Sequence, residues 1–449
     1  MVTLSIDPDP ACTGLASLGE SMTSIQPVVM LPDDNARAYA ESTAPAQIEG
    51  ASPPLHATEE MRRLATPWAV ANAKAKLVHS CELPSGVILD PACGSATQLA
   101  ALCSVLNRPG LGIELSGAVA PLAAVNLARC GESSGEDWTT TSRVIWGDGT
   151  AAASIMQTYQ NHIDQNPTIA LLHVDPARPN DAQQHTLNEM QPRLDELLTS
   201  WAPYLGTEPA IILDVSPRLL ETQRQEIETI VTSIWGELPM TWQWLTQGRG
   251  RIDRLSLWVG AAAGTSPSRL VRLSKTGDVH IIEGVSKSLN ALPSNVQAGD
   301  HLVIADPCLI ASGLCEAWTS LFANEGGRWE TVLGRRPIFI SSNPTFLIQD
   351  ELNSDKGSPM IVESMIQSTG EVVANIQTLD EESILEITRI AADAGIHSLK
   401  LRCSLDPDLQ PKLQSKIDRE MRVYPPTAST KSGFIAETSS SHVICKEYD

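Results

Sequence analysis

The sequence predicts an α/β protein, with a mostly parallel sheet that is covered by helices and ends in an antiparallel hairpin, followed by a C-terminal α+β domain. Three observations support this prediction. Short, continuously apolar segments alternate with helical stretches from residue 58 to residue 235. Two segments of alternating polarity follow, with glycines between them. After Gly264 the chain changes to short strands and loops. Continuous apolar strands separated by helices are typical of a parallel sheet buried on both faces.

The elements of the first part follow in order along the chain. Helices are expected at 58–78 (with a break at Pro67), 96–106, 117–130, 150–162, 186–202 and 219–235. Strands are expected between them at 87–89, 111–113, 144–146, 169–174 and 210–215. The segments 241–244 and 255–258 alternate in polarity, with Gly248 and Gly250 between them, and this pattern predicts the hairpin.

The rest of the chain predicts a second, smaller domain. Its expected strands are 269–273, 279–283, 397–402 and 440–445, and its expected helices are 308–323, 381–394 and 407–421. Residues 1–56 are rich in Ser, Ala, Thr, Pro and Asp without a sustained period, so we expect a flexible acidic tail. The expected domains are therefore 57–262 and 263–449.

Composition excludes several classes of protein. Hydrophobic residues make up 42% of the chain and charged residues 19%, which excludes wholesale disorder. The net charge of −21 argues against tight, nonspecific binding to nucleic acid. No apolar run approaches the ~18 residues that a membrane span needs. The nine cysteines form no CxxC pair, so neither a zinc ribbon nor a thioredoxin-like redox site is indicated, and no metal site is expected. We expect a soluble, cytoplasmic protein; its oligomeric state is left open.

A carboxylate ends each of the first four expected strands: Asp90, Glu114, Asp148 and Asp175. Ligands of open parallel sheets bind outside the carboxyl ends of the strands. A single Asp at such a place often only caps the next helix. Four in register favour a binding site.

The first turn, Asp90 to Thr97, reads DPACGSAT and contains one glycine, Gly94. The absence of GxGxxG argues against a nicotinamide or flavin cofactor. Small residues still let a ligand approach the backbone closely. Glu114 ends the next strand, where an acid can accept both hydroxyls of a ribose, and Asp148 could accept from an adenine amine. The pattern suits an adenosyl ligand without a phosphate.

These motifs resemble those of class I S-adenosylmethionine-dependent methyltransferases. DPACGSAT is similar to the DPxCGSGT motif of several enzymes that methylate exocyclic amines of nucleic-acid bases, with Ala96 in place of a glycine. GIEL (112–115) and WGDGTA (146–151) look like the family's second-strand end and adenine-side loop. DPAR (175–178) takes the place of the (D/N)PP(Y/F) motif and departs from it at Ala177 and Arg178.

Further segments resemble a subfamily that carries a C-terminal THUMP-like domain. They are LATPWAVANAKAKLV (64–78), HVDPARP (173–179), Val215-Ser216-Pro217 and ADPCLIASGL (305–314). Asp214 stands where this subfamily tends to have a lysine. The resemblance implies a Rossmann-like, seven-stranded, mostly parallel sheet with an antiparallel terminal hairpin. Because THUMP domains bind RNA, it also implies an RNA substrate, tRNA or rRNA.

The resemblance implies a role for each site residue. Asp90, Ala92, Gly94, Glu114 and Asp148 would bind S-adenosylmethionine. Asp175, Pro176, Ala177 and Arg178 would line the acceptor side, where Arg178 could contact a phosphate bidentately.

We therefore expect a methyltransferase that acts on an RNA base by direct displacement. One alternative is a methyltransferase with a protein or small-molecule acceptor. Another is a catalytically silent, methyltransferase-like scaffold that binds RNA or protein. A dehydrogenase is the least favoured, because the first turn lacks the phosphate-binding glycines.

Overall fold

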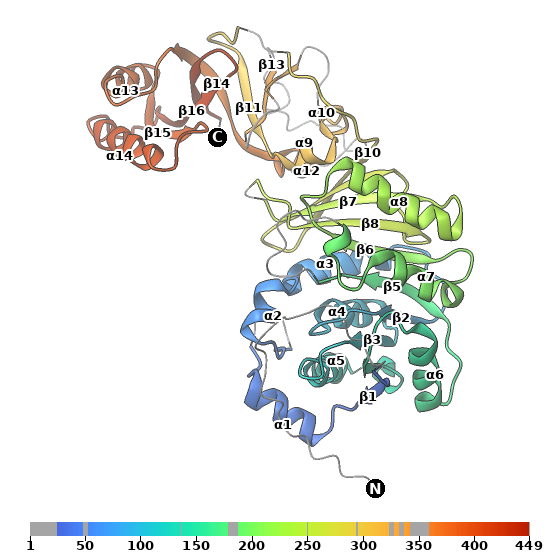
Figure 1. The fold of residues 1–449 in the computed structure, drawn as a ribbon. Coiled ribbons are helices and arrows are strands. Elements are labelled where there is room, and N and C mark those ends of the chain that lie inside the picture. The colour runs from blue at the N-terminus through green and yellow to red at the C-terminus, as the bar shows by residue number, and fades with distance from the viewer. Residues whose placement is uncertain are drawn as a thin grey trace, which may run out of the picture.

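The computed structural model describes residues 25–47, 53–135, 137–177, 187–248, 250–292, 295–322, 327–331, 336–341 and 359–448. Two β-sheets organise these residues, one of ten strands and one of seven (Figure 1). The first sheet positions the candidate site. The second sheet lies beside the edge of the first sheet that the last strands of that sheet form.

The first sheet has the strand order β1-β4-β3-β2-β5-β6-β8-β7-β9-β10. Its strands are β1 (Val28–Met30), β2 (Val87–Asp90), β3 (Gly110–Glu114), β4 (Arg143–Trp146), β5 (Ile169–Val174), β6 (Ala210–Val215), β7 (Met240–Thr246), β8 (Arg254–Gly260), β9 (Ser268–Leu273) and β10 (Val279–Gly284). The five strands from β4 to β6 are parallel. β8 runs antiparallel to both β6 and β7. The expected parallel sheet with an antiparallel hairpin is present.

The expected count of seven strands is wrong for this sheet. β1 adds an antiparallel strand beside β4 at one edge. β9 pairs in parallel with β7 at the other edge, and β10 pairs with β9. β9 and β10 were expected as strands of the second domain, but the sheet runs past residue 262. Alternation in polarity predicts a strand but not the strand with which it pairs. The sequence therefore did not show which sheet β9 and β10 join.

Helices cover both faces of the first sheet. They are α2 (Glu59–Leu64), α3 (Trp68–His79), α4 (Thr97–Leu106), α5 (Ala120–Ser134), α6 (Ala152–Ile163), α7 (Leu194–Leu205) and α8 (Glu221–Trp235). α3, α4 and α5 pack with Ile88 and Ile212 in one core cluster. α6, α7 and α8 pack with Leu89 and Leu213 in another. Neighbouring residues of a strand point to opposite faces, so these strands are buried on both sides.

The N-terminal segment differs from the expected flexible tail. Residues 28–30 form β1, and α1 (Asp34–Thr43) follows, with its first turn capped by Asp33. α1 is fastened to α5 and the preceding loop, because Tyr39 donates to the Ala118 carbonyl at 3.2 Å and Arg37 pairs with Glu132. Three apolar residues are too few to show a period, so this strand could not be predicted from the sequence.

The second sheet has the order β12-β13-β11-β14-β17-β16-β15. Its strands are β11 (His301–Ala305), β12 (Arg328–Thr331), β13 (Ile338–Ser341), β14 (Ile366–Ile376), β15 (Ile396–Arg402), β16 (Lys431–Glu437) and β17 (His442–Glu447). β15 and β16 are parallel, and the other pairs are antiparallel. α13 (Ile384–Asp393) and α14 (Leu409–Met421) pack together against β15.

Short helices join the two sheets. The single helix expected at 308–323 is two helices, α9 (Cys308–Ser312) and α10 (Cys315–Thr319), because Gly313 between them has a left-handed backbone with φ of +68°. α9 and α10, with α12 (Pro359–Glu363), pack on β7, β9 and β10. Arg272 also pairs with Asp306 across this junction, at 3.4 Å.

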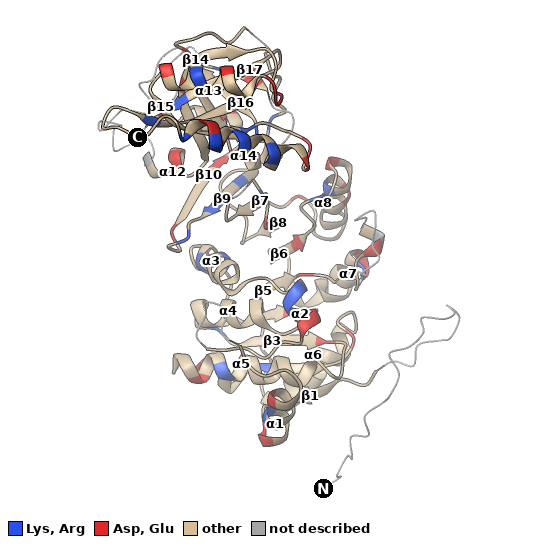
Figure 2. Cartoon of the chain, turned by 90° about the vertical axis from the view of Figure 1, so that its left-hand side faces the viewer, with Lys and Arg blue, Asp and Glu red and all other residues tan. Residues whose placement is uncertain are grey.

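Charges of both signs are interspersed along the described chain (Figure 2). α14 (Leu409–Met421) carries charges of both signs: Lys412, Lys416, Asp418, Arg419 and Glu420. In the described part of the chain, no helix is long and apolar enough to cross a membrane.

Candidate active site

The carboxyl ends of β2, β3, β4, β5 and β6 meet at one edge of the first sheet, because these strands are parallel neighbours. This edge brings together the loops that carry Asp90, Glu114, Asp148 and Asp175. The chain direction of β7 and β9 brings their carboxyl ends to the same edge.

The turn after β2 is shaped for close approach of a ligand. Gly94 has a left-handed φ of +52°, and a Cβ placed on it would meet no atom within 4 Å. Ala92 donates its N–H to the Asp90 carboxylate at 3.2 Å. Ala96 is also left-handed, with φ of 58°, and is fully buried at the start of α4. The motif thus leaves open space at Gly94 and places strain at Ala96.

Glu114 lies beside that turn. Its Oε1 accepts the N–H of Ser116 at 2.7 Å, and the Gly94 N–H also faces the carboxylate. Burial raises the pKa of Glu114, although these N–H groups oppose the rise. A partly buried carboxylate held by N–H groups on one side can accept hydroxyl groups on its other side.

Asp148 closes the loop that follows β4. Its Oδ1 accepts both the N–H and the hydroxyl of Thr150, at 2.9 and 2.8 Å. Gly149 is needed there, because a Cβ at that residue would lie 2.0 Å from the Pro91 carbonyl oxygen. The β2 and β4 loops therefore touch. Leu115, the last residue of GIEL, is 54% exposed, and its carbonyl accepts the Nε1–H of Trp146 at 3.1 Å.

The loop after β5 begins with Asp175, which is partly exposed, followed by buried Pro176 and exposed Ala177. The Asp175 Oδ2 accepts from Gln98 Nε2 at 2.8 Å. The Ala177 carbonyl accepts the N–H of Gln191 at 3.0 Å, so the loop is held to the chain that returns toward α7. Arg178 lies outside the described residues.

Behind these loops is a buried polar cluster, formed by Lys74, Asp90, His173, Asp214 and Ser256. His173 lies between two carboxylates: its Nδ1 is 2.9 Å from Asp90 Oδ2 and its Nε2 is 3.4 Å from Asp214 Oδ2. Lys74 Nζ, from α3, also donates to Asp214 Oδ2. Ser256, on β8, donates to Asp214 Oδ1 at 2.6 Å.

This buried cluster is charged. Burial lowers the pKa of His173, but Asp90 and Asp214 outweigh it and raise the pKa to about 9. Burial raises the pKa of Asp214, but Lys74 and His173 outweigh it and hold the pKa well below its usual range. Two cations therefore face two anions, which is the arrangement that makes buried charges tolerable.

The sequence carried partial signals of this cluster. His173 was expected as a satisfied core histidine, and it is fully buried and bonded on both nitrogens. Lys74 lies on the apolar side of α3, since Val70 and Val78 one turn before and after it are also buried. A lysine in an apolar helical stripe predicts a buried partner. Asp214, the departure from the subfamily pattern, is that partner.

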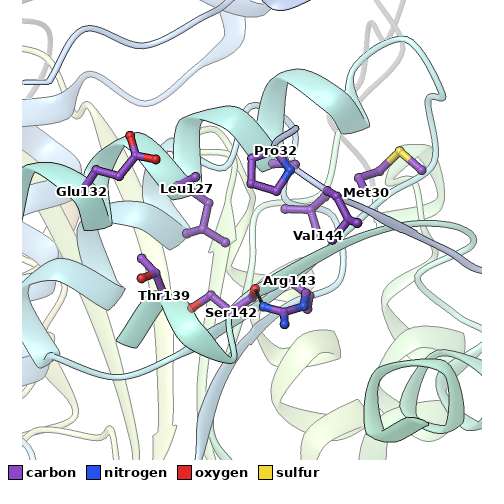
Figure 3. Close-up of a pocket in the computed structure, with 11 residues that line it drawn as sticks. Met30, Pro32, Leu127, Glu132, Thr139, Ser142, Arg143 and Val144 are labelled. Carbon is purple, nitrogen blue, oxygen red and sulfur yellow. Dashed lines mark hydrogen bonds between the residues drawn. The ribbon is translucent and has the colours of Figure 1, made fainter. Parts of the chain in front are cut away.

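The described residues contain no group of three or more His, Cys, Asp or Glu side chains arranged to hold a metal ion. A pocket of about 220 Å³ lies away from the carboxyl ends of the parallel strands, between α5, the start of β4 and the segment after β1 (Figure 3). Met30, Leu127 and Val144 give it apolar walls. Glu132 and Arg143 also line it.

In comparisons with known proteins, the chain is similar to solved structures only. No family model matches the chain, and no curated protein matches it. A Listeria monocytogenes protein assigned to the class I S-adenosylmethionine-dependent methyltransferases is 13% identical, with a TM-score of 0.32, over 44% of this chain and 61% of that one. The rRNA methyltransferase aviRa from Streptomyces viridochromogenes is 15% identical, with a TM-score of 0.32, over 46% of this chain and 89% of that one. TrmN from Thermus thermophilus is 16% identical, with a TM-score of 0.28, over 43% and 48%.

Proposed function

We propose that this chain is an S-adenosylmethionine-dependent methyltransferase that acts on an RNA base. The observation that carries the proposal is the convergence at one sheet edge of the open Gly94 turn, the Glu114 carboxylate and the Asp175 loop. These parts come from three neighbouring parallel strands, β2, β3 and β5, and the DPACGSAT, GIEL and DPAR motifs supply them in that order.

The residues present fit an adenosyl ligand. Gly94 offers free space beside the backbone, and Glu114 offers a carboxylate for ribose hydroxyls. Ala92 and Asp148 lie in the loops after β2 and β4, the two strands that flank β3 and its Glu114. Asp90 belongs to the site through the backbone of its turn, because its own carboxylate is engaged with His173 and Ala92. S-adenosylmethionine would supply a methyl group on a sulfonium, which transfers in one in-line displacement.

The chain's own contribution to that step is orientation and proton handling. Asp175 and the carbonyl groups around Pro176 would accept hydrogen bonds from the attacking atom of the base. That contact points the lone pair of the attacking atom at the methyl group, and the proton that this atom loses can pass to Asp175 or to water. Arg178 would hold an acceptor phosphate. The second sheet, if it serves as the THUMP-like domain that the resemblance implies, would hold the RNA.

Calorimetric titration with S-adenosylmethionine, in the presence of a chelator, tests the first half of the proposal. We expect heat of binding with a dissociation constant in the micromolar range. The absence of such heat would favour the catalytically silent scaffold. Incubation with labelled cofactor and total RNA from cells lacking this protein tests the second half. If the label appears in a protein or small-molecule fraction and not in RNA, the acceptor is a protein or a small molecule and the RNA proposal is wrong.

A further inference from the structure

A continuous chain of hydrogen bonds runs from α3 to the edge of the candidate site. Lys74 Nζ donates to Gln98 Oε1 at 2.7 Å, and Gln98 Nε2 donates to Asp175 Oδ2 at 2.8 Å. The three residues come from α3, from α4 and from the loop after β5. Lys74 lies within the segment 64–78 and Gln98 directly follows DPACGSAT, but neither residue was expected at the site from the sequence.

The direction of this chain is fixed by its chemistry. A lysine ammonium has three donors and no acceptor, so the Gln98 carbonyl must face Lys74. The amide NH₂ must then face Asp175. Lys74 and Gln98 are 1% and 8% exposed, so the protein packing holds them. Asp175 is the partly exposed end of the chain.

Charged groups face Asp175 from four elements: Lys74 on α3, His173 on β5, Asp214 on β6 and Arg254 on β8. Burial and then Asp214 raise the pKa of Asp175, while Arg254, Lys74 and His173 oppose the rise. Arg254 is itself held by Thr66, whose hydroxyl accepts from Nε at 3.0 Å and from Nη2 at 2.7 Å. The ionised carboxylate therefore depends on cations that are fixed in place.

We propose that Lys74 and Gln98 are positioning residues, which hold the Asp175 carboxylate by Oδ2 and leave Oδ1 directed at the acceptor. This inference rests on the proposed function, because Asp175 has a reaction to serve only if methyl transfer occurs there. Lys74, on a helix that covers the sheet, fixes the orientation of the Gln98 amide. Gln98 in turn fixes the Asp175 carboxylate and does not itself contact the acceptor.

Three variants of the full chain test the proposal. Gln98→Leu removes the donor to Asp175. Gln98→Glu keeps the shape and the contact with Lys74 but turns a second carboxylate toward Asp175. Gln243→Leu is the matched control, because Gln243 is a buried glutamine on β7 whose side chain has no hydrogen-bond partner in the described structure.

The first readout does not need an acceptor. In protein labelled with ¹³C at aspartate carboxyls, with the Asp175 signal assigned by its loss in Asp175→Asn, we expect the titration of Asp175 to move to higher pH in both Gln98 variants. The Gln243 variant should titrate like the parent. An unmoved Asp175 titration in both Gln98 variants would overturn the proposal, whatever the activity of the protein.

The second readout uses labelled cofactor and the same total RNA. We expect kcat to fall about 10- to 100-fold in both Gln98 variants, with the dissociation constant for S-adenosylmethionine within about threefold of the parent. The acid limb of the pH–rate profile should move to higher pH. Parent-like kcat in Gln98→Glu overturns the positioning role. If the parent itself transfers no methyl group to RNA, the proposed function fails, and the carboxyl titration still decides whether Gln98 controls Asp175.

Discussion

Lys74 on α3 and Asp214 at the end of β6 form an ion pair in which both side chains are 1% exposed. They are 140 residues apart in the sequence. The pair joins α3 to β6, the last of the five parallel strands in the sheet order, directly behind the loops of the candidate site. A buried pair of this kind is costly to break from one side only.

We expect Lys74→Met to destabilise the fold by about 3–5 kcal/mol, because it leaves the Asp214 carboxylate buried without its cation. The double variant Lys74→Met/Asp214→Asn removes both charges and should recover at least half of that loss. Urea unfolding of the parent and the two variants measures this. A single variant as stable as the parent would show that His173 and Ser256 are enough to hold Asp214.

The buried imidazolium of His173 predicts a dependence of stability on pH. The pKa of His173 is raised from 6.5 to about 9 in the folded protein by Asp90 and Asp214, which outweigh burial. Its contribution is therefore fully present below about pH 6.5 and is lost as the pH rises through about 9. We expect the free energy of unfolding to fall by up to about 3 kcal/mol over that range. His173→Gln should lack this component. Equal slopes in parent and variant, in urea unfolding at a series of pH values, would contradict the assignment.

Glu114→Ala should weaken the binding of S-adenosylmethionine by about 1–3 kcal/mol, the cost of leaving ribose hydroxyls unpaired in a closed site. The fold should persist, since Glu114 ends a strand and bonds only backbone N–H groups of its neighbours. Calorimetric titration measures the change. Glu132→Ala is the control, because Glu132 lies on α5 in an exposed pair with Arg37. An unchanged dissociation constant in Glu114→Ala would make that residue a turn cap only.

Asp175→Ala should separate binding from chemistry. Its carboxylate is bonded to Gln98 and lies at the start of the loop that we assign to the acceptor. Affinity for S-adenosylmethionine should stay within about threefold, while methyl transfer falls on the order of 100-fold or more. Single-turnover assays with labelled cofactor measure both. Transfer at the parent's rate would remove the DPAR loop from the active site.

The sequence predicted the parallel core of the fold well, because apolar strands such as 169–174 and 210–215 coincide with β5 and β6. It failed for β1, which is three residues long, and for the sheet membership of β9 and β10. Within the site, the carboxylates were visible because each ends a strand or follows one within two residues. Gln98 was not, since its role depends on how α4 packs against α3, and helix packing leaves no local motif. Lys74 was visible only as a lysine in an apolar helical stripe, without its partner Asp214.

The first turn allows a last, paired prediction. Ala96 is held at φ of 58° and is fully buried, while Gly94 has φ of +52° and open space at its Cβ position. An L-residue other than glycine costs roughly 1 kcal/mol in this conformation. Ala96→Gly should therefore stabilise the fold, by about 0.5–1 kcal/mol in urea unfolding, and leave cofactor affinity near that of the parent.

Gly94→Ala should do the opposite on both measures. It introduces the same strain, so the fold should lose roughly 1 kcal/mol. Its methyl group would also occupy the free space beside Glu114, so S-adenosylmethionine should bind at least about tenfold more weakly. If Gly94→Ala loses stability but keeps its affinity, the space beside Gly94 is not where the ligand lies. If Ala96→Gly gains no stability, the left-handed turn at Ala96 is relaxed by its surroundings, and the residue at this position is set by packing and not by backbone strain.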